Sequence, residues 1–161
     1  MDLTVTELAA RLQPGQRLIG LDPGSKTIGV AISDSALKVA SPLETIKRTK
    51  FTQDAARLTE ICARYKIGGL IMGLPVNMDG SEGPRCQSVR ALARNLVEKG
   101  GFTQPVAFWD ERLSTAAVER FLVDEADMTR KRRAEVVDKM AAAYILQGAL
   151  DALSRQAPRQ R

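Results

Sequence analysis

Asp22 is the first residue in this 161-residue sequence whose position suggests chemistry. It follows the apolar run 18–21, which is typical of a buried strand, and precedes a tight turn at Pro23 and Gly24. The segment 27–34 then has the pattern of the returning strand of a hairpin. A carboxylate at the end of a buried strand is costly unless something compensates it, and the glycines of this hairpin leave room for a phosphate or a metal ion. Asp22 could equally cap the turn, as aspartate often does, and the hairpin alone leaves both interpretations open.

Three further acids occupy positions of interest. Asp110 and Glu111 come directly after the apolar run 106–109, and Asp138 lies in an apolar helical pattern with small alanines at 141 and 142. Small residues would let that helix approach a sheet closely, as a third metal ligand requires. The ordinary interpretations are that Asp110 and Glu111 begin a helix, where acids suit the helix dipole, and that Asp138 is exposed. The acids can converge only if the last helix packs against the sheet near the first strand.

The absence of histidine narrows the chemistry that is available. It excludes Ser-His-Asp and Cys-His nucleophile systems, histidine general bases and His-ligated zinc. An enzyme with this sequence must use carboxylates, lysines, hydroxyls or a metal held by oxygen ligands. Cys62 and Cys86 lack CxxC spacing, and we expect both to be reduced. No stretch approaches the ~18 apolar residues of a membrane span and the N-terminus has no secretory pattern, so the expected location is cytoplasmic.

The net charge of +5 favours an anionic partner. The basic excess is local: Lys47, Arg48 and Lys50 form one cluster, the run 130–133 a second, and the arginines of the tail 154–161 a third. The run 130–133 is typical of a solvated loop between helices. A basic loop beside an active site could also grip a phosphodiester backbone.

The hydrophobic pattern predicts a mixed α/β domain without internal repeats or linkers. The chain is expected to begin with a short, peripheral helix capped by Thr4 and Glu7. Strands are predicted at 18–21, 27–34, 38–47, 70–72 and 106–109. Further helices are predicted at 51–65, capped by Thr52 and ended by Gly68-Gly69, at 84–99, from 114 or 115, and at 134–153. We expect the last helix to bury Val136, Val137, Met140, Ala141, Tyr144, Ile145 and Leu150.

Two details refine this prediction. Pro42 within the third strand indicates an edge position or a bulge. The loop 73–84 follows the carboxyl end of a strand, where open α/β sheets usually bind ligands. Asn77, Asp79 and Ser81 in that loop could serve a site or could only stabilise turns.

Four sequence blocks are the most specific features of the chain. They are GLDPGSKTIGVAISD at the first hairpin, GLPVNMDGSEG after the fourth strand, WDERLSTAAVE at the last strand and VVDKMAAAYIL on the last helix. Together they resemble the YqgF/RuvX family of predicted Holliday junction resolvases, also described as pre-16S rRNA nucleases, over about residues 17–153. The resemblance implies one RNase H-like domain spanning 1–161, built on a mixed five-stranded sheet flanked by helices. Residues 1–16 would be an N-terminal extension and 154–161 a basic tail.

The resemblance also implies an acidic catalytic triad of Asp22, Glu111 and Asp138. Asp110 adjoins the triad as a further candidate metal ligand, and whether Asp110 or Glu111 faces the metal stays open. One or two Mg²⁺ ions, or Mn²⁺ in their place, could activate water, stabilise the leaving oxygen and neutralise the phosphate. The residues expected to contact nucleic acid are Lys26, Asn77, Arg112, Ser114, Thr115, Arg130, Lys131, Arg132 and Arg133.

The residues predict a metal-dependent nuclease that hydrolyses phosphodiester bonds, and the resemblance implies that it acts on the 5′ end of precursor 16S ribosomal RNA, with the pre-ribosomal small subunit as a partner. Two alternatives stay open: a resolvase of branched DNA in recombination or repair, and a non-catalytic nucleic-acid-binding factor in ribosome assembly. An actin-like or sugar-kinase-like ATPase is disfavoured because 161 residues cannot supply the second domain that encloses the nucleotide. Aromatic residues make up only 4% of the chain, which favours backbone contacts and metal chemistry over base stacking.

Overall fold

The computed structural model describes residues 3–113 and 130–156 of the chain. Five strands form one mixed sheet in the order β3-β2-β1-β4-β5. The strands are β1 (Arg17–Pro23), β2 (Thr27–Ser33), β3 (Ala40–Lys47), β4 (Ile67–Leu74) and β5 (Val106–Asp110). β1, β2 and β3 pair antiparallel, whereas β4 and β5 run parallel to β1. The predicted mixed five-stranded sheet is confirmed, and the parallel strands end at a common edge.

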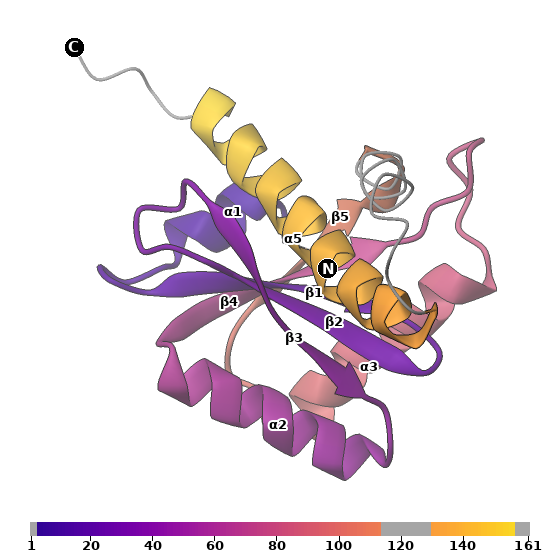
Figure 1. Cartoon of the computed structure of the whole chain (residues 1–161). Coiled ribbons are helices and arrows are strands. Elements are labelled where there is room, and N and C mark those ends of the chain that lie inside the picture. The colour runs from indigo at the N-terminus through magenta and orange to yellow at the C-terminus, as the bar shows by residue number, and fades with distance from the viewer. Residues whose placement is uncertain (1–2, 114–129, 157–161) are drawn as a thin grey trace.

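Helices cover both faces of the sheet. They are α1 (Val5–Ala10), α2 (Phe51–Arg64), α3 (Pro84–Glu98) and α5 (Arg130–Gln156), with a short 3₁₀ turn, η1 (Glu111–Leu113), after β5. α2 and α3 lie on one face, and α5 crosses the other face with α1 beside it (Figure 1). Each face therefore has its own apolar core. The predicted helix starting at 114 or 115 lies outside the described residues.

Helix α5 lies directly on the sheet because glycines remove side chains from its path. A Cβ atom added at Gly29 would lie 1.9 Å from the carbonyl oxygen of Asp138, and one at Gly20 would lie 2.7 Å from the Cβ atom of Leu146. Neither position accepts a side chain unless the helix moves. Ala142, which also faces Gly20, is fully buried. This close packing brings Asp138 over β2.

The predicted buried stripe of α5 was only partly right. Ile145 and Leu150 are buried as expected, but Met140, Ala141 and Tyr144 are only partly buried, and so is Val137. The side chain of Val136 lies outside the described residues. The residues buried against the sheet also include Ala142, Ala143, Leu146 and Ala149. Glycines on the sheet surface let the alanines of α5 pack closely against it. Helical periodicity alone does not show which side of a helix will pack in this way.

The start of α5 also differs from the prediction. The helix begins at Arg130 and not near Ala134, so the backbone of the basic run 130–133 is helical rather than a loop. The buried apolar face nearer the C-terminal end of α5 supplies the packing that stabilises one continuous helix.

The segment after α2 corrects a second prediction. Lys66 adopts a left-handed conformation with φ of 55° and ends the helix, so Gly68 and Gly69 belong to β4 instead of stopping α2. A Cβ atom at Gly68 would lie 2.4 Å from Oε1 of Gln16, and one at Gly69 would lie 3.0 Å from the side chain of Leu8. These glycines let the N-terminal segment pack onto β4. Leu8 is fully buried, so α1, which we expected to be peripheral, is anchored to the sheet by this side chain.

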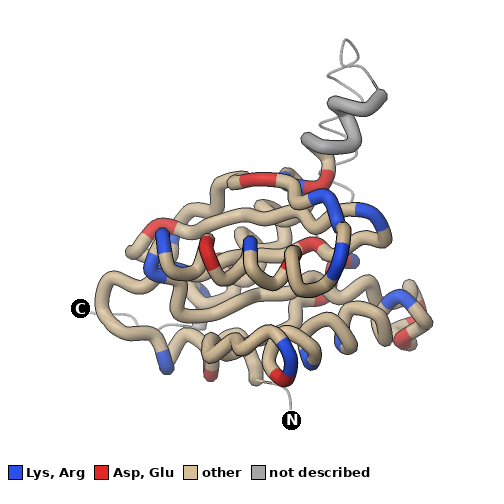
Figure 2. Tube along the Cα trace, turned by 90° about the horizontal axis from the view of Figure 1, so that it is seen from below, with Lys and Arg blue, Asp and Glu red and all other residues tan. Residues whose placement is uncertain are grey.

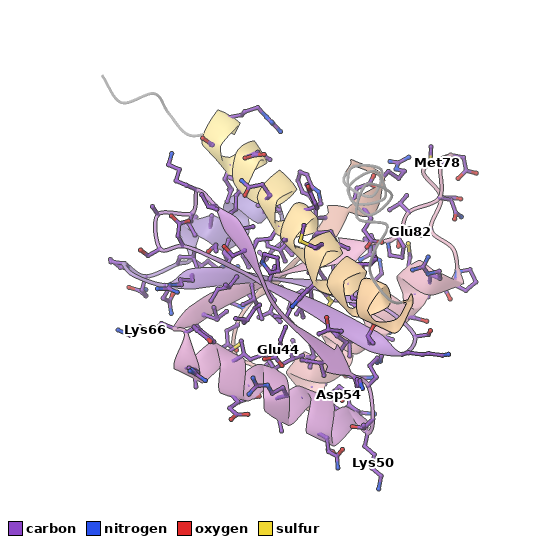
Figure 3. The ribbon with its side chains drawn as sticks, viewed as in Figure 1. Glu44, Lys50, Asp54, Lys66, Met78 and Glu82 are labelled. Carbon is purple, nitrogen blue, oxygen red and sulfur yellow. The ribbon has the colours of Figure 1, made fainter. Side chains whose placement is uncertain are left out.

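Two predictions about helix starts have different outcomes. Thr4 and Glu7 cap α1 reciprocally, as expected, with the backbone N–H of each donating to the side chain of the other at 3.0 Å. The expected cap of α2 by Thr52 was wrong. Instead the buried carboxylate of Asp54 accepts the backbone N–H of Thr49 at 3.2 Å, just before the helix (Figure 3).

The remaining expectations for the core are met. β3 is an edge strand, and its pairing with β2 shifts register beside Pro42, so both the edge and the bulge are present. Cys62 and Cys86 are free and buried. In the ranges 3–113 and 130–156, no helix is sufficiently long and apolar to cross a membrane.

Candidate acidic site at the ends of β1 and β5

The carboxyl groups of Asp22 and Glu111 meet at the edge of the sheet where the parallel strands end. Asp22 lies near the end of β1, and Glu111 begins η1 directly after β5. The two side chains are hydrogen-bonded to each other. Since a carboxylate can only accept hydrogen bonds, this contact favours the protonated form of Asp22.

Glu111 reaches Asp22 because the strand between them carries a glycine. β4 lies between β1 and β5, and Gly73 of β4 pairs with Trp109 of β5. A Cβ atom at Gly73 would lie 3.1 Å from both Cγ and Oε1 of Glu111. The Glu111 side chain therefore lies over the space that Gly73 leaves free.

The environment of this pair raises the pKa of Asp22 to about 8. Burial is the largest cause, because it disfavours the charged form, followed by the hydrogen bond and the negative charge of Glu111. The positive charge of Arg85 acts in the opposite direction. A divalent cation held at this site would favour the charged form of Asp22.

Asp138 is the third acid of the cluster and comes from α5. The hydroxyl of Thr27, at the start of β2, donates a 2.6 Å hydrogen bond to Oδ2 of Asp138. Burial raises the pKa of Asp138, the Thr27 hydrogen bond lowers it, and the charge of Asp22 raises it. Asp138 and Asp22 therefore lie near enough to interact electrostatically, as expected if α5 packs near β1.

Three carboxylates suit a hard divalent cation, which prefers oxygen ligands. In the described part of the chain, however, no three His, Cys, Asp or Glu side chains are grouped closely enough to hold a metal ion. Asp22 and Glu111 are in contact, and Asp138 lies beside them with one oxygen engaged by Thr27. The arrangement offers a pair of ligands and an adjacent third.

Asp110 binds Arg112 and not Asp22. The Arg112 guanidinium donates to both carboxylate oxygens of Asp110 at 2.6 to 3.1 Å, and this holds the pKa of Asp110 below its ordinary value. The same guanidinium donates to the backbone carbonyl oxygens of Asn77 and Met78, at 3.4 and 3.3 Å. Of the two adjacent acids, Glu111 is the one that contacts Asp22.

The loop between β4 and α3 is stabilised by its own polar side chains. Asn77 Nδ2 donates to the hydroxyl of Ser81 at 3.1 Å, and the carboxylate of Asp79 accepts the Ser81 N–H at 2.9 Å. These contacts correspond to the turn-stabilising interpretation of the three residues. Met78 is 89% exposed in this loop (Figure 3).

The residues expected to contact nucleic acid differ in exposure and in hydrogen bonding. Lys26 is exposed in the turn between β1 and β2, whereas Asn77 and Arg112 belong to the hydrogen-bonded loop network. Figure 2 shows basic and acidic positions interspersed along the chain on the side in view. The remaining side chains of this set lie outside the described residues: Ser114, Thr115, Arg130, Lys131, Arg132 and Arg133.

Sequence reasoning missed two residues beside the acids. Thr27 binds Asp138, and Arg85 is near enough for its charge to act on Asp22. Thr27 lies within the block of the first hairpin, and Arg85 directly follows the loop 73–84. Their roles depend on partners from distant segments, so spacing alone carries no signal for them.

Comparisons with known proteins place these features in a family. The model of the RuvX family, described as Holliday junction resolvase, matches residues 16–152. The chain is 64% identical over 145 residues to a Roseobacter denitrificans protein named "Putative pre-16S rRNA nuclease", covering 90% of this chain and 88% of that protein. It is 62% identical over 152 residues to a Rhodospirillum rubrum protein of the same name, covering 94% and 93%.

A solved structure supports the fold independently. RuvC of Thermus thermophilus, in complex with a Holliday junction substrate, aligns with a TM-score of 0.54 and 18% identity, covering 85% of this chain and 94% of that chain. At this identity the likeness concerns the fold alone. It confirms the expected RNase H-like arrangement of sheet and helices.

Proposed function

Because this chain belongs to the RuvX family of Holliday junction resolvases, we propose that its acidic cluster is the catalytic centre of a metal-dependent nuclease. The observation that carries the proposal is the contact between Asp22 and Glu111. It holds two half-buried carboxyl groups together at the end of the sheet, with Asp138 adjacent. Acids whose pKa is shifted by burial and by a neighbouring acid are typical of functional sites.

Mg²⁺ is the proposed cation, with Mn²⁺ as a substitute, because the candidate ligands Asp22, Glu111 and Asp138 offer only carboxylate oxygens. When bound, such a cation neutralises phosphate charge, activates water and stabilises the leaving oxygen. The protein positions the ligands: Gly73 leaves space for Glu111, and Thr27 fixes one oxygen of Asp138. A cation held by these residues would favour the charged form of Asp22, whose pKa is raised in its absence.

The proposed substrate is the 5′ end of precursor 16S ribosomal RNA, processed in the cytoplasm on the pre-ribosomal small subunit. Relatives whose name specifies pre-16S rRNA share 62 to 64% of their residues with this chain over about nine-tenths of its length. Lys26 and Arg112 flank two of the acids in sequence and would contact the phosphate backbone. Asn77, Ser114, Thr115 and the basic run 130–133 complete the proposed contacts.

A four-way DNA junction is the second candidate substrate. The family description supports it, and the RuvC structure was solved with a Holliday junction substrate. Paired cuts in a junction need two active sites, so this candidate predicts a symmetric dimer. Trimming one RNA strand needs only one active site.

The test is cleavage of labelled precursor ribosomal RNA and of a four-way DNA junction, side by side, with Mg²⁺, with Mn²⁺ and with chelator. The wild type is compared with Asp22→Asn and with the control Asp151→Asn, an exposed acid on α5 away from the cluster. We expect metal-dependent cleavage of the RNA that Asp22→Asn abolishes and Asp151→Asn preserves. Symmetric cuts in the junction alone would favour the resolvase. Binding without cleavage under any metal would contradict the nuclease and favour a non-catalytic assembly factor.

A further inference from the structure

A pocket of about 430 Å³ opens at the turn that follows Asp22. Its walls are the turn 23–25, which directly follows Asp22, together with Arg48 after β3, Phe51 at the start of α2, and α3 from Arg85 to Asn95. The pocket is linked to the acids in two ways: its turn directly follows Asp22, and the charge of its Arg85 acts on the Asp22 carboxyl.

Arg48 and Arg85 line the pocket. Arg48 Nη1 donates to the carbonyl oxygen of Gly24 at 2.7 Å, and the Arg48 backbone N–H donates to the carbonyl oxygen of Lys26 at 2.8 Å. These bonds hold Arg48 against the hairpin turn. Arg85 is exposed and close enough to Asp22 for its charge to reach that carboxyl. Within residues 3–113 and 130–156, neither arginine forms a salt bridge.

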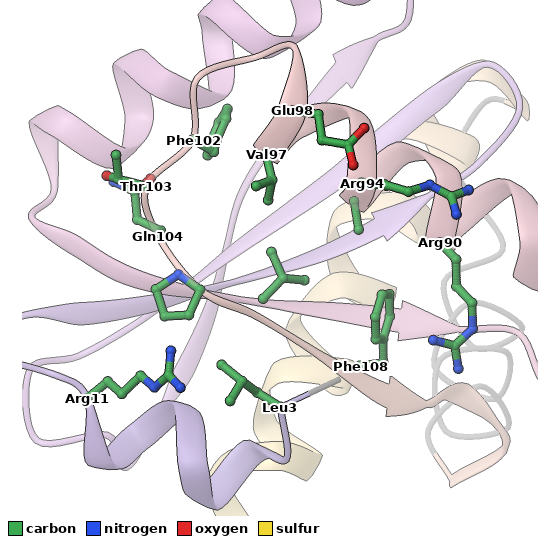
Figure 4. Close-up of a pocket in the computed structure, with 13 residues that line it drawn as sticks. Leu3, Arg11, Arg90, Arg94, Val97, Glu98, Phe102, Thr103, Gln104 and Phe108 are labelled. Carbon is green, nitrogen blue, oxygen red and sulfur yellow. The ribbon is translucent and has the colours of Figure 1, made fainter. Parts of the chain in front are cut away.

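A larger groove on the other side of α3 provides a contrast. It measures about 800 Å³ and lies between α1, α3 and β5 (Figure 4). Its Arg90 is bound to Glu82 at 2.7 Å and lies 4.7 Å from the ring centre of Phe108. Arg94 also lines this groove, on the same helix as Arg85, and is exposed as well. Arg94 is therefore a matched control for Arg85.

We propose that the pocket between Arg48 and Arg85 is a subsite for one nucleotide of the substrate strand, with its phosphate bound by the two guanidinium groups. The inference rests on the proposed nuclease function, because it concerns the nucleotide next to the bond that is cut. Guanidinium groups bind phosphate through paired, charge-assisted hydrogen bonds. The pocket volume lies within the roughly 300–1,000 Å³ of small-molecule sites.

The other lining residues suit a nucleotide. The half-buried ring of Phe51 offers an aromatic face for a base. Ser25 and Ser88 offer exposed hydroxyls to sugar or phosphate oxygens. Of the basic cluster Lys47, Arg48 and Lys50, Arg48 is the member that lines this pocket.

The first experiment measures binding in chelator, where cleavage cannot interfere. Single-stranded RNA from the 5′ region of the precursor is titrated by fluorescence anisotropy at several salt concentrations. Arg48→Ala and Arg85→Ala should each weaken binding about tenfold, as loss of a charged hydrogen-bonding partner implies. Each should also lower the slope of log Kd against log salt, and the loss of both arginines should lower it by about 0.7, the value for one phosphate contact on a single strand. Arg85→Lys should retain most of the slope, and Arg94→Ala should match the wild type.

The second experiment identifies the phosphate. A neutral methylphosphonate is placed at successive positions of the RNA, and binding is measured for the wild type and for Arg85→Ala. At one position beside the cleavage site, the substitution should weaken wild-type binding about tenfold and weaken binding by the Arg85→Ala variant less, because only Arg48 remains to contact that phosphate.

The experiments distinguish the loss of the subsite from the loss of the nuclease activity. Unchanged affinity and salt slope in both alanine variants, with wild-type cleavage intact, would overturn the subsite and leave the nuclease in place. A wild type that cleaves neither RNA nor a DNA junction with any metal would overturn the nuclease and the subsite together. Melting temperatures equal to that of the wild type establish that the exposed arginine substitutions leave folding intact.

Discussion

The hydroxyl of Thr27 donates a 2.6 Å hydrogen bond to Asp138 across 111 positions of sequence. Two residues further along β2, Gly29 leaves the space into which the carbonyl of Asp138 fits. The strand therefore fixes both the backbone and the side chain of Asp138. A helix position that is ordinary in the sequence becomes part of the acidic cluster in the fold.

Removing the Thr27 hydroxyl should weaken metal binding and preserve folding. Thr27→Val keeps the shape of the side chain but frees Oδ2 of Asp138, and loss of such an orienting contact typically costs about 10–100-fold in metal affinity. The Mg²⁺ concentration for half-maximal cleavage should rise accordingly, and Thr27→Ser should restore it. Equal Mg²⁺ dependence in the valine variant and the wild type would contradict this role.

A side chain at Gly29 should displace α5. Because its Cβ atom would lie 1.9 Å from the Asp138 carbonyl oxygen, Gly29→Ala should lower the free energy of unfolding by about 1–3 kcal/mol or more. Urea unfolding measures the loss. Gly83→Ala is the control, because its added Cβ atom would have its nearest neighbour at an ordinary 3.4 Å. A similar change in both variants would argue against the close packing of α5 on β2.

Asp22 should destabilise the metal-free protein as the pH rises. Its pKa is about 8 in the folded chain, against roughly 3.9 in an unfolded one, so the folded state binds more protons between these values. The favourable contribution of Asp22 is complete below about pH 4 and is lost as the pH rises to about 8. In chelator, the stability of Asp22→Asn relative to the wild type should therefore increase across this range. A constant difference in the free energy of unfolding would contradict the buried acid pair.

Mg²⁺ should stabilise the protein more at about pH 8 than at about pH 6, because the cation competes with the proton of the Asp22–Glu111 pair. Thermal unfolding with and without Mg²⁺ measures the effect at each pH. The increase in melting temperature should disappear in Asp22→Asn. An increase of the same size in that variant would assign the bound cation to another place.

Substitutions of the adjacent acids Asp110 and Glu111 should lower the cleavage rate by very different factors. Glu111 contacts Asp22, so Glu111→Gln should reduce cleavage by orders of magnitude. Asp110 holds Arg112, and Arg112 in turn holds the loop through the carbonyl oxygen of Met78. Asp110→Asn should therefore lower the cleavage rate by no more than about tenfold. Single-turnover cleavage rates distinguish the two, and the reverse order of effects would exchange the roles of these residues.

Local patterns predicted much of the fold. The hairpin of β1 and β2 is defined by an apolar run, a turn and a second run, and α3 begins at Pro84 with a regular apolar stripe. Both signals lie within short segments and do not depend on partners elsewhere. The candidate acids were also visible, because each interrupts or ends an apolar segment.

Tertiary packing decided the rest. Gly68 and Gly69 have the local signature of a helix stop, but they lie in β4 because Leu8 and Gln16 occupy the space above them. The choice between Asp110 and Glu111 depends on Gly73, which belongs to a neighbouring strand. Neither fact can be inferred from residue type and spacing within one segment.

Helix α5 covers β1, β2 and β3, and it brings Asp138 to Thr27 from a distant part of the chain. A nascent chain whose α5 is still inside the exit tunnel of the ribosome already carries Asp22 and Glu111 but has no Asp138 beside them. Its set of acids is completed only when translation has delivered the last helix to the sheet. In a protein proposed to cut ribosomal RNA, the acidic cluster is therefore incomplete while the chain is still attached to the ribosome that makes it.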